Sequence, residues 1–263
     1  GLVAGSQLCS DRSYPQFTQS RKTTRHYQIT MPTVYLIPSF LADDTRETIP
    51  PYVLESVKKC NVIFAENERT ARRFLKAMDR EIVIDHFEWY AIHKAEEEQV
   101  STFKKCIQDG KNIAIISEAG CPGVADPGQI LVAAAQEMNC LVKPLVGPSS
   151  ILLALMASGL NGQQFEFVGY LPIDGLERSK KIKELENHSL KYNSTKIFIE
   201  TPYRNNQLLE ALCQHANDKT KLCIGINITA ASESILTRTV SQWRNKKPEL
   251  HKLPVIFLLY AGV

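Results

Sequence analysis

Short apolar runs alternate with helical stretches along this chain, and this alternation constrains the fold most. The run Asn112–Ser117 (NIAIIS) is apolar on both faces, as expected of a strand inside a parallel sheet. A helical pattern precedes it at residues 91–108, and another follows at 129–138. Because strands that alternate with helices are joined by crossovers, the sequence predicts a mostly parallel, doubly wound α/β sheet.

The same alternation divides the chain into two halves that differ in how their predicted strands and helices are arranged along the sequence. In the first half we expect further strands at 34–38, 61–66, 82–85 and 141–145, and helices at 50–60 and 68–78. After Gly147 the strands cluster towards the end, which predicts a second α/β domain with a mixed sheet. Here we expect strands at 196–200, 222–229, 234–240 and 254–260, an apolar segment at 165–170, and helices at 149–158, 177–187 and 205–215. The predicted domains are residues 31–147 and 148–263.

Residues 1–30 differ from the rest in composition. They carry four basic residues and one acidic residue, which accounts for the whole net charge of +3. The remaining chain is balanced in charge, so composition gives no independent sign of a nucleic-acid partner. Without a periodic apolar pattern, this stretch is expected to be a disordered extension, dispensable for folding, with Met31 as the natural start.

The cysteines and the lack of long apolar runs indicate the compartment. Seven cysteines are scattered without CxxC spacing, which argues against a disulfide framework and favours a reducing, cytoplasmic setting. No apolar run approaches the roughly 20 residues of a membrane span, so no membrane partner is expected. Six histidines form no HxH or HExxH pair, and no metal site is predicted.

Three glycine- and proline-rich turns follow predicted strands. They are SEAGCPGVADPG at Ser117–Gly128, VGPSSI at Val146–Ile151 and IETPYR at Ile199–Arg204. The carboxyl ends of strands in open α/β sheets bind ligands, and small residues let the backbone approach a ligand closely. Each turn alone is also compatible with a purely structural role.

Taken together, these segments resemble the tetrapyrrole (corrin/porphyrin) methylase superfamily. The first turn is similar to the family loop S-D/E-A-G-x-P-x-x-x-D-P-G. VGPSSILLALMASGL, FEFVGYLP and IETPYRNNQLLEAL resemble its later motifs, over residues 34–262 as a whole. The nearest branch is the bacterial 16S ribosomal RNA ribose 2'-O-cytidine methyltransferase. The resemblance implies an S-adenosylmethionine-dependent methyltransferase, usually a homodimer, with its cofactor in a cleft between two α/β domains.

The resemblance also implies which residues hold the cofactor, while the candidates for catalysis follow from the chemistry of methyl transfer. Methyl transfer to a hydroxyl needs a group that accepts the proton. The carboxylates Asp126, Glu200 and Glu66 are candidates for that role, and a turn-stabilising role is the alternative for each. The cofactor-binding candidates are Ile37, Pro38, Ser39, Ser117, Ala119, Gly120, Val124, Ala125, Ser149, Ser150, Ile151, Thr201 and Pro254.

Three departures from the family pattern leave the methyl acceptor open. The segment after the first strand, LIPSFLADDTRETIPP, lacks glycine. The family's A-E-D-T-R appears as Ala65–Arg69, which keeps the glutamate and arginine but loses the aspartate and threonine, and the segment Gly225–Glu233 lacks the family's basic residues. Ribosomal RNA, a tetrapyrrole or another small molecule, and a catalytically weak cofactor-binding role are the alternatives. If RNA is the acceptor, the basic helix carrying Arg69, Arg72, Arg73 and Lys76 is the expected contact, and a solvated helix face is the alternative.

Overall fold

The computed structural model describes residues 31–262, with the exception of residues 44 and 93–95. The predictions made for residues 1–30 therefore lie outside the described part of the chain. Within that part, no helix is both long and apolar enough to cross a membrane.

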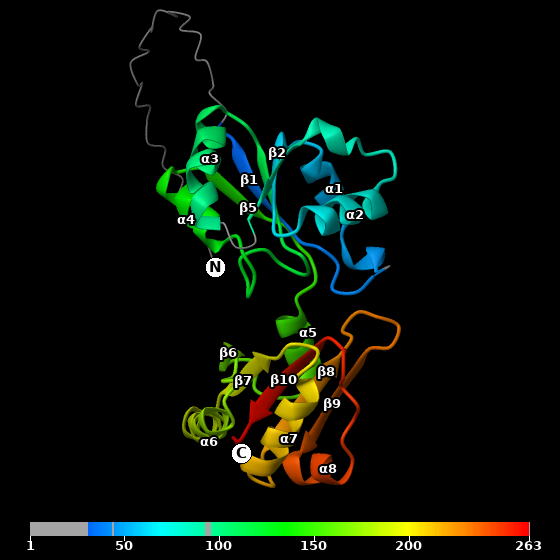
Figure 1. Cartoon of the computed structure of the whole chain (residues 1–263), viewed down its shortest axis with the longest axis vertical. Helices are drawn as coiled ribbons and strands as arrows, with labels where there is room; N and C mark the ends of the chain where they lie inside the picture. Colours follow the sequence, from blue (N-terminus) through cyan, green and yellow to red (C-terminus); the bar gives the residue numbers. More distant parts are fainter. Residues whose placement is uncertain (1–30, 44, 93–95, 263) are drawn as a thin grey trace, which may run out of the picture. The chain divides into compact units, whose positions relative to one another are not determined.

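The first half of the described chain forms a five-stranded, wholly parallel sheet, which confirms the predicted doubly wound architecture (Figure 1). Its order is β3-β2-β4-β1-β5, so the two central neighbours β4 and β1 are far apart in sequence. The strand β4 is buried along its whole length, in agreement with its apolar sequence. The strands are β1 Thr33–Ile37, β2 Val62–Ala65, β3 Glu88–Ala91, β4 Ile113–Ile116 and β5 Leu141–Pro144.

Two pairs of helices cover the two faces of this sheet (Figure 1). On one face, α1 (Pro51–Val57) and α2 (Glu68–Met78) pack through a core that includes Phe74 and Ile116. On the other face, α3 (Glu96–Gln108) and α4 (Gln129–Glu137) share a core with Phe64. In β1 and β2, alternate residues therefore pack into opposite cores, as the period of two in a strand requires.

The third strand lies later than the sequence predicts, and that prediction was wrong. Residues 82–85 enter a short 3-10 turn, Ile84–His86, while the strand itself is Glu88–Ala91. The buried Ile82 and Ile84 gave the segment a strand-like pattern, but they pack into the α1–α2 core. Because β3 is a partly exposed edge strand, its sequence shows only a weak apolar pattern. The helix predicted at residues 91–108 was also placed too early, since residue 91 belongs to β3 and α3 begins at Glu96.

The second half forms a mixed five-stranded sheet, as predicted. Its order is β6-β7-β10-β8-β9, in which only the β6–β7 pair is parallel. The strands are β6 Phe165–Tyr170, β7 Thr195–Ile199, β8 Lys221–Ile226, β9 Ser234–Thr239 and β10 Val255–Tyr260.

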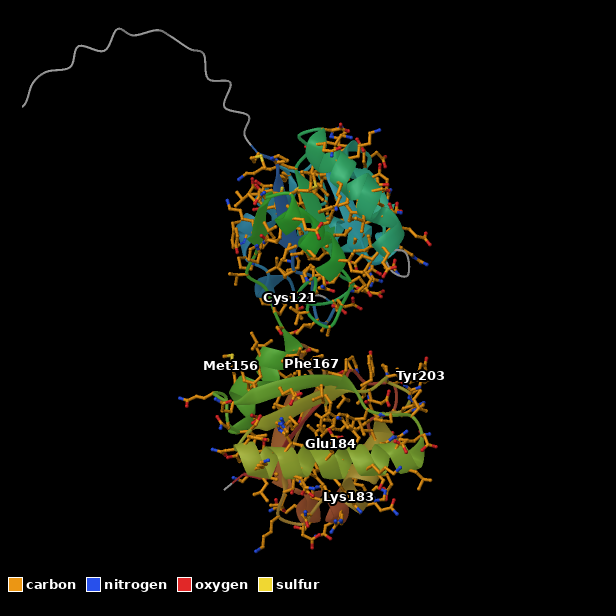
Figure 2. All side chains as sticks on the ribbon, turned by 90° about the vertical axis from the view of Figure 1, so that its left-hand side faces the viewer. Cys121, Met156, Phe167, Lys183, Glu184 and Tyr203 are labelled. Atoms are coloured by element: carbon orange, nitrogen blue, oxygen red, sulfur yellow. The ribbon has the colours of Figure 1, made fainter. Side chains whose placement is uncertain are left out.

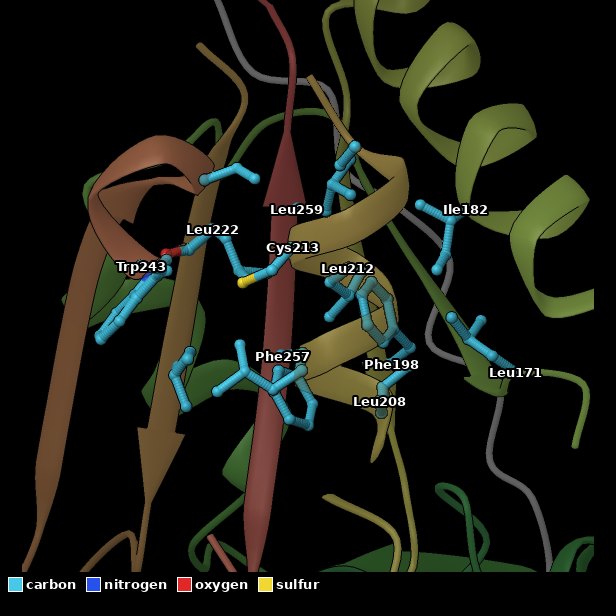
Figure 3. Packing of buried hydrophobic residues seen from close by; sticks show 14 of the residues in the cluster. Leu171, Ile182, Phe198, Leu208, Leu212, Cys213, Leu222, Trp243, Phe257 and Leu259 are labelled. Atoms are coloured by element: carbon cyan, nitrogen blue, oxygen red, sulfur yellow. The ribbon is translucent and has the colours of Figure 1, made fainter. Parts of the chain in front are cut away.

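Helices again cover both faces of the second sheet. In the larger core, shown in Figure 3, Phe257 of β10 packs with Leu208 and Leu212 of α7 (Asn205–His215) and with Trp243 of α8 (Val240–Asn245). The helix α6 (Gly175–Tyr192) closes this core, and α5 (Ser150–Ser158) covers the opposite face. The helix α8 was not predicted; its six residues offer only one turn of apolar spacing.

Two buried or half-buried glutamates fix loops to helices. Glu186 of α6 accepts hydrogen bonds from the backbone and side-chain amides of Asn217 at 2.8 and 2.6 Å, and also from the hydroxyl of Thr220. Glu96 Oε1 accepts from the backbone amides of Gly128, Ile130 and Leu131 at 2.9–3.1 Å. A side chain at the start of α3 therefore caps the N-terminus of α4.

Candidate active site

The loops after β1 and β4 are joined directly to each other. The amide of Ser39 donates to the carbonyl of Gly120 at 2.8 Å, and the amide of Gly120 donates to the carbonyl of Ser39 at 3.2 Å. The hydroxyl of Ser39 also donates to the carbonyl of Ser117 at 3.0 Å. Since β1 and β4 are neighbouring parallel strands, their carboxyl ends meet, and two predicted segments become one unit.

A cavity of about 780 Å³ opens beside this unit. A volume of this size suits a ligand of drug or cofactor size. Its walls combine apolar side chains with hydroxyl, amide and charged groups. The apolar side chains can bury a ligand's surface, and the polar groups can fix its orientation. The lining residues come from the segment after β1 (39–43), from α2 (Thr70, Arg73, Phe74 and Ala77), from the loop after β4 (Glu118 and Ala119), and from Ser150, Ile199, Gly225, Asn227, Ile228, Pro254, Val255 and Ile256.

Four of the predicted cofactor-binding residues line this cavity: Ser39, Ala119, Ser150 and Pro254. Others support the same loops without lining it. Ile37 is a core residue of β1, Ser117 is buried and donates within its own loop, and Ile151 packs on the core beneath α5. Pro38 is buried, Ser149 is the N-cap of α5, and Val124, Ala125 and Thr201 are also outside the lining set.

Gly120 and Gly147 are required by close packing of the chain on itself. At Gly120, with φ of +75°, an added Cβ would meet Leu41 Cδ2 at 3.2 Å and the carbonyl of Pro148 at 3.5 Å. At Gly147 a Cβ would lie 2.2 Å from Pro38 Cβ, which no real side chain permits. The side-chain direction of Gly120 therefore faces protein atoms, so substitution there perturbs the loop itself.

The same loop is also tied to the segment before α5. Cys121 (Figure 2) donates through its thiol to the carbonyl of Pro148 at 3.4 Å. This weak bond and the packing of Gly120 on Pro148 both connect the turn after β4 to the turn after β5. Two of the glycine- and proline-rich turns identified in the sequence are thus in contact.

Three carboxylates gather at the ends of β2 and β4. Glu66 accepts from the backbone amide of Glu118 at 2.8 Å, and Glu118 accepts from Asn67 Nδ2 at 3.3 Å and Thr70 Oγ1 at 3.2 Å. Burial raises the pKa of Asp126 to about 7, and the charges of Glu66 and Glu118 add to this shift. A carboxyl with a pKa near neutrality can accept a proton under physiological conditions.

Glu200 is the third predicted catalytic carboxylate, but its surroundings differ. Its buried side chain forms an ion pair with Arg204 at 2.7 Å and accepts from the amide of Thr201 at 2.6 Å. Burial acts to raise the pKa of Glu200, but the hydrogen bonds from Arg204 and Thr201 outweigh burial and lower it. A carboxylate held ionised in this way is a poor proton acceptor, so Glu200 supports the turn after β7.

The basic helix α2 contributes one of its cations to the cavity. Arg73 lines it, whereas Arg72 is paired with Glu68 at 2.7 Å and lies over the ring of Trp89. The ammonium of Lys76 donates to the carbonyls of Arg80 and Ile82. Among the described residues, the sequence analysis did not select Asp43, Thr70, Glu118 or Asn227 as site residues. Arg73 was predicted as one of four RNA-contacting cations of this helix, with a solvated helix face as the alternative.

The described residues contain no group of three or more His, Cys, Asp or Glu side chains arranged to hold a metal ion.

A model of the family described as Tetrapyrrole (Corrin/Porphyrin) Methylases matches residues 45–243 of this chain. The match spans more than half of the sequence and includes the loop after β4 and the turn after β7. The chain belongs to the tetrapyrrole (corrin/porphyrin) methylase family.

Curated relatives and solved structures agree with this assignment. The chain is 31% identical over 209 residues to a Ribosomal RNA small subunit methyltransferase I of Mesorhizobium japonicum, covering 80% of this chain and 68% of the relative. The protein of that name from Bacillus subtilis is 28% identical over 219 residues, with coverage of 81% and 70%. The methyltransferase CobJ has the same fold at 16% identity, with a TM-score of 0.58 over 87% of this chain and 92% of its own.

These findings confirm the predicted superfamily, its ribosomal RNA branch and the class of enzyme, an S-adenosylmethionine-dependent methyltransferase. A solved uroporphyrin-III C-methyl transferase of Thermus thermophilus, complexed with S-adenyl homocysteine, shares the fold with a TM-score of 0.55 at 15% identity, over 87% of this chain and 97% of that one.

Proposed function

We propose that this methyltransferase modifies ribosomal RNA of the small subunit at a ribose 2'-hydroxyl. The observation that carries the proposal is the similarity to relatives named for that substrate, which extends over four fifths of this chain. The cavity supports it, because an acceptor nucleotide needs both apolar surface and charged groups at the cavity.

S-adenosylmethionine supplies an electrophilic methyl group when bound, and the cavity fits such a ligand. The polar groups of Ser39 and Ser150 and the small side chain of Ala119 allow close approach to a cofactor. Pro254 contributes an apolar wall. Ser39 is positioned by its paired hydrogen bonds with Gly120, so its loop is held in place before a ligand binds.

Asp126 is the preferred proton acceptor among the three predicted carboxylates because of its pKa and its place in the loop after β4, although none of the three is among the residues that line the cavity. Its pKa of about 7 keeps a useful fraction ionised at neutral pH while leaving the carboxylate basic enough to take a proton. Glu66 is engaged by the amide of Glu118, and Glu200 is engaged by Arg204. Glu66 raises the pKa of Asp126, and Glu200 holds the turn after β7.

Methyl transfer to unmodified small ribosomal subunits tests this function. We expect label from methyl-labelled S-adenosylmethionine to appear in the RNA, at a rate that rises with pH through about 7. Asp126→Asn should lower the rate by 10²-fold or more, the order expected for loss of a general base. If the chain binds S-adenosylmethionine in calorimetry but labels no RNA, the acceptor is instead a tetrapyrrole or other small molecule, or the chain is a catalytically weak binding protein.

A second copy of the chain is the proposed protein partner. The helix α5 carries no charged residue and exposes Leu152 and Met156, the latter to 79% of its surface (Figure 2). An exposed apolar helix face of this kind favours association, and a homodimer is the commonest form. Met156→Glu should therefore shift the sedimenting species from dimer to monomer; a parent that is already monomeric would refute the pairing.

The proposed location is the cytoplasm. Every cysteine in the described part of the chain is a free thiol, and burial raises the pKa of Cys60 to about 12. Unpaired, unreactive cysteines suit a reducing compartment, where ribosome assembly would also place the substrate. Fractionation of cells that express the full chain checks this location.

A further inference from the structure

In the part of the chain that the structure describes, a single cation lines the cavity. Among the lining residues that the structure describes, Arg73 is the only basic one, while Asp43 and Glu118 are acidic. The side chains of Arg73 and Asp43 are 73% and 89% exposed, and their closest atoms, Nη2 and Oδ1, are 3.7 Å apart. This distance exceeds that of a hydrogen bond, so Asp43 attracts the guanidinium without satisfying its donors.

Two neighbouring cations on α2, Arg72 and Lys76, are held in a different way, and a third, Arg69, is not among the residues that line the cavity. Arg72 donates to Glu68 at 2.9 Å through Nε and stacks over Trp89 at 4.7 Å from the ring centroid. Lys76 donates to two backbone carbonyls at 2.9 and 2.7 Å. Both side chains therefore stabilise the folded chain, and Arg73 differs from them by its loose pairing and its place at the cavity.

A loose, exposed ion pair contributes little to folding, at most about 1 kcal/mol. A phosphate group competes well for such an arginine, because it carries a similar or greater charge and accepts two parallel hydrogen bonds from the guanidinium fork. Asp43 lies beside the same guanidinium and repels a phosphate. Arg73 and Asp43 are thus arranged as an attracting and a competing group at one wall of the cavity.

We propose that Arg73 binds a backbone phosphate of the RNA acceptor at the cavity, and that Asp43 is the anion which that phosphate displaces. The inference rests on the proposed function, since it takes RNA as the acceptor. Arg73 then has a positioning role, in which phosphate binding places the target ribose. Asp43 lowers the RNA affinity, because it competes with the phosphate for the same guanidinium.

Four variants of the full chain test this proposal: Arg73→Gln, Asp43→Asn, the double variant, and Arg72→Gln as a matched control on the same helix. Affinity for an unmodified 16S ribosomal RNA transcript is measured by filter binding over a range of salt concentrations. S-adenosylmethionine affinity is measured by calorimetry, and folding by the melting temperature.

We expect Arg73→Gln to weaken RNA binding about 5–10-fold and to reduce the salt slope by about one ion. Asp43→Asn should tighten RNA binding about 2–4-fold. Most of that gain should be absent in the Arg73→Gln background, since Asp43 affects RNA binding through the arginine. Arg72→Gln should lower the melting temperature while leaving RNA affinity within about twofold of the parent's. S-adenosylmethionine affinity should be the same in all variants.

Two results would overturn the assignment of Arg73 alone. One is an unchanged RNA affinity in Arg73→Gln when the parent binds the transcript; the other is a loss of S-adenosylmethionine affinity with RNA binding intact, which would place the cofactor's carboxylate on this arginine. A parent that neither binds nor methylates the transcript would overturn the proposed function, and this inference with it.

Discussion

Replacing Asp126 by asparagine should stabilise the protein at alkaline pH relative to the parent while lowering its activity about 10²-fold or more. The pKa of Asp126 rises from 3.8 to about 7 on folding, chiefly through burial and further through Glu66 and Glu118. The folded state therefore holds this proton more tightly than the unfolded state does. Stability from Asp126 is fully present below pH about 4 and is lost as the pH rises towards 7.

The size of the effect follows from the shift of about three pKa units. At about 1.4 kcal/mol per unit, the full shift corresponds to about 4 kcal/mol. Because Asp126 is only partly buried, solvent screening reduces this, and we expect about 1–2 kcal/mol. The asparagine side chain carries no charge at any pH, so the variant should lack this loss of stability.

Urea unfolding of the parent and of Asp126→Asn at pH 5 and pH 8 measures the effect. The difference in unfolding free energy between variant and parent should move in favour of the variant by about 1–2 kcal/mol from the lower to the higher pH. Other titrating groups cancel, since both proteins contain them. A difference that is independent of pH would refute the neutral pKa of Asp126 and with it the argument that this carboxyl accepts the proton.

Two further predictions test the cavity and the second core. Ala119→Leu should lower S-adenosylmethionine affinity at least 10-fold in calorimetry with an unchanged melting temperature, because Ala119 lines the cavity; Val124→Leu, in the same loop but outside the lining set, is the control, and an equal loss in both would contradict the site. Glu186→Ala should cost about 2–4 kcal/mol in urea unfolding, since it leaves the amides of Asn217 and the hydroxyl of Thr220 without their acceptor; the exposed Glu184→Ala should cost far less.

The sequence was most informative where burial and periodicity coincide. The helix at residues 68–78 was predicted with its observed bounds, because its apolar positions recur on one face and Asn67 caps it. The strand β3 was placed too early, because the buried Ile82 and Ile84 outweighed a partly exposed edge strand in the pattern. The helix α8 is too short to show a period.

The candidate site was predicted in part, and for a similar reason. Ala119 and Ser150 belong to turns with distinctive glycine and proline spacing, so the sequence revealed them, whereas Ser39 was selected only through the family resemblance. Asp43 is an exposed charged residue, which in a sequence cannot be distinguished from any solvated surface, and Arg73 could be predicted only as one of four basic residues on the same helix. Only the meeting of the segment after β1 with α2 along one cavity wall distinguishes them.

The cap that Glu96 places on α4 has a consequence for which nucleotide ligands this fold accepts. In many doubly wound proteins the helix after a glycine-rich loop presents its amide groups to a pyrophosphate. Here one carboxylate oxygen already accepts from three amides at that position, and a phosphate would have to displace a negative charge of the chain itself. The loop is therefore closed to dinucleotides and nucleoside triphosphates at this helix, while a ligand without phosphate, such as a sulfonium nucleoside, meets no such competition.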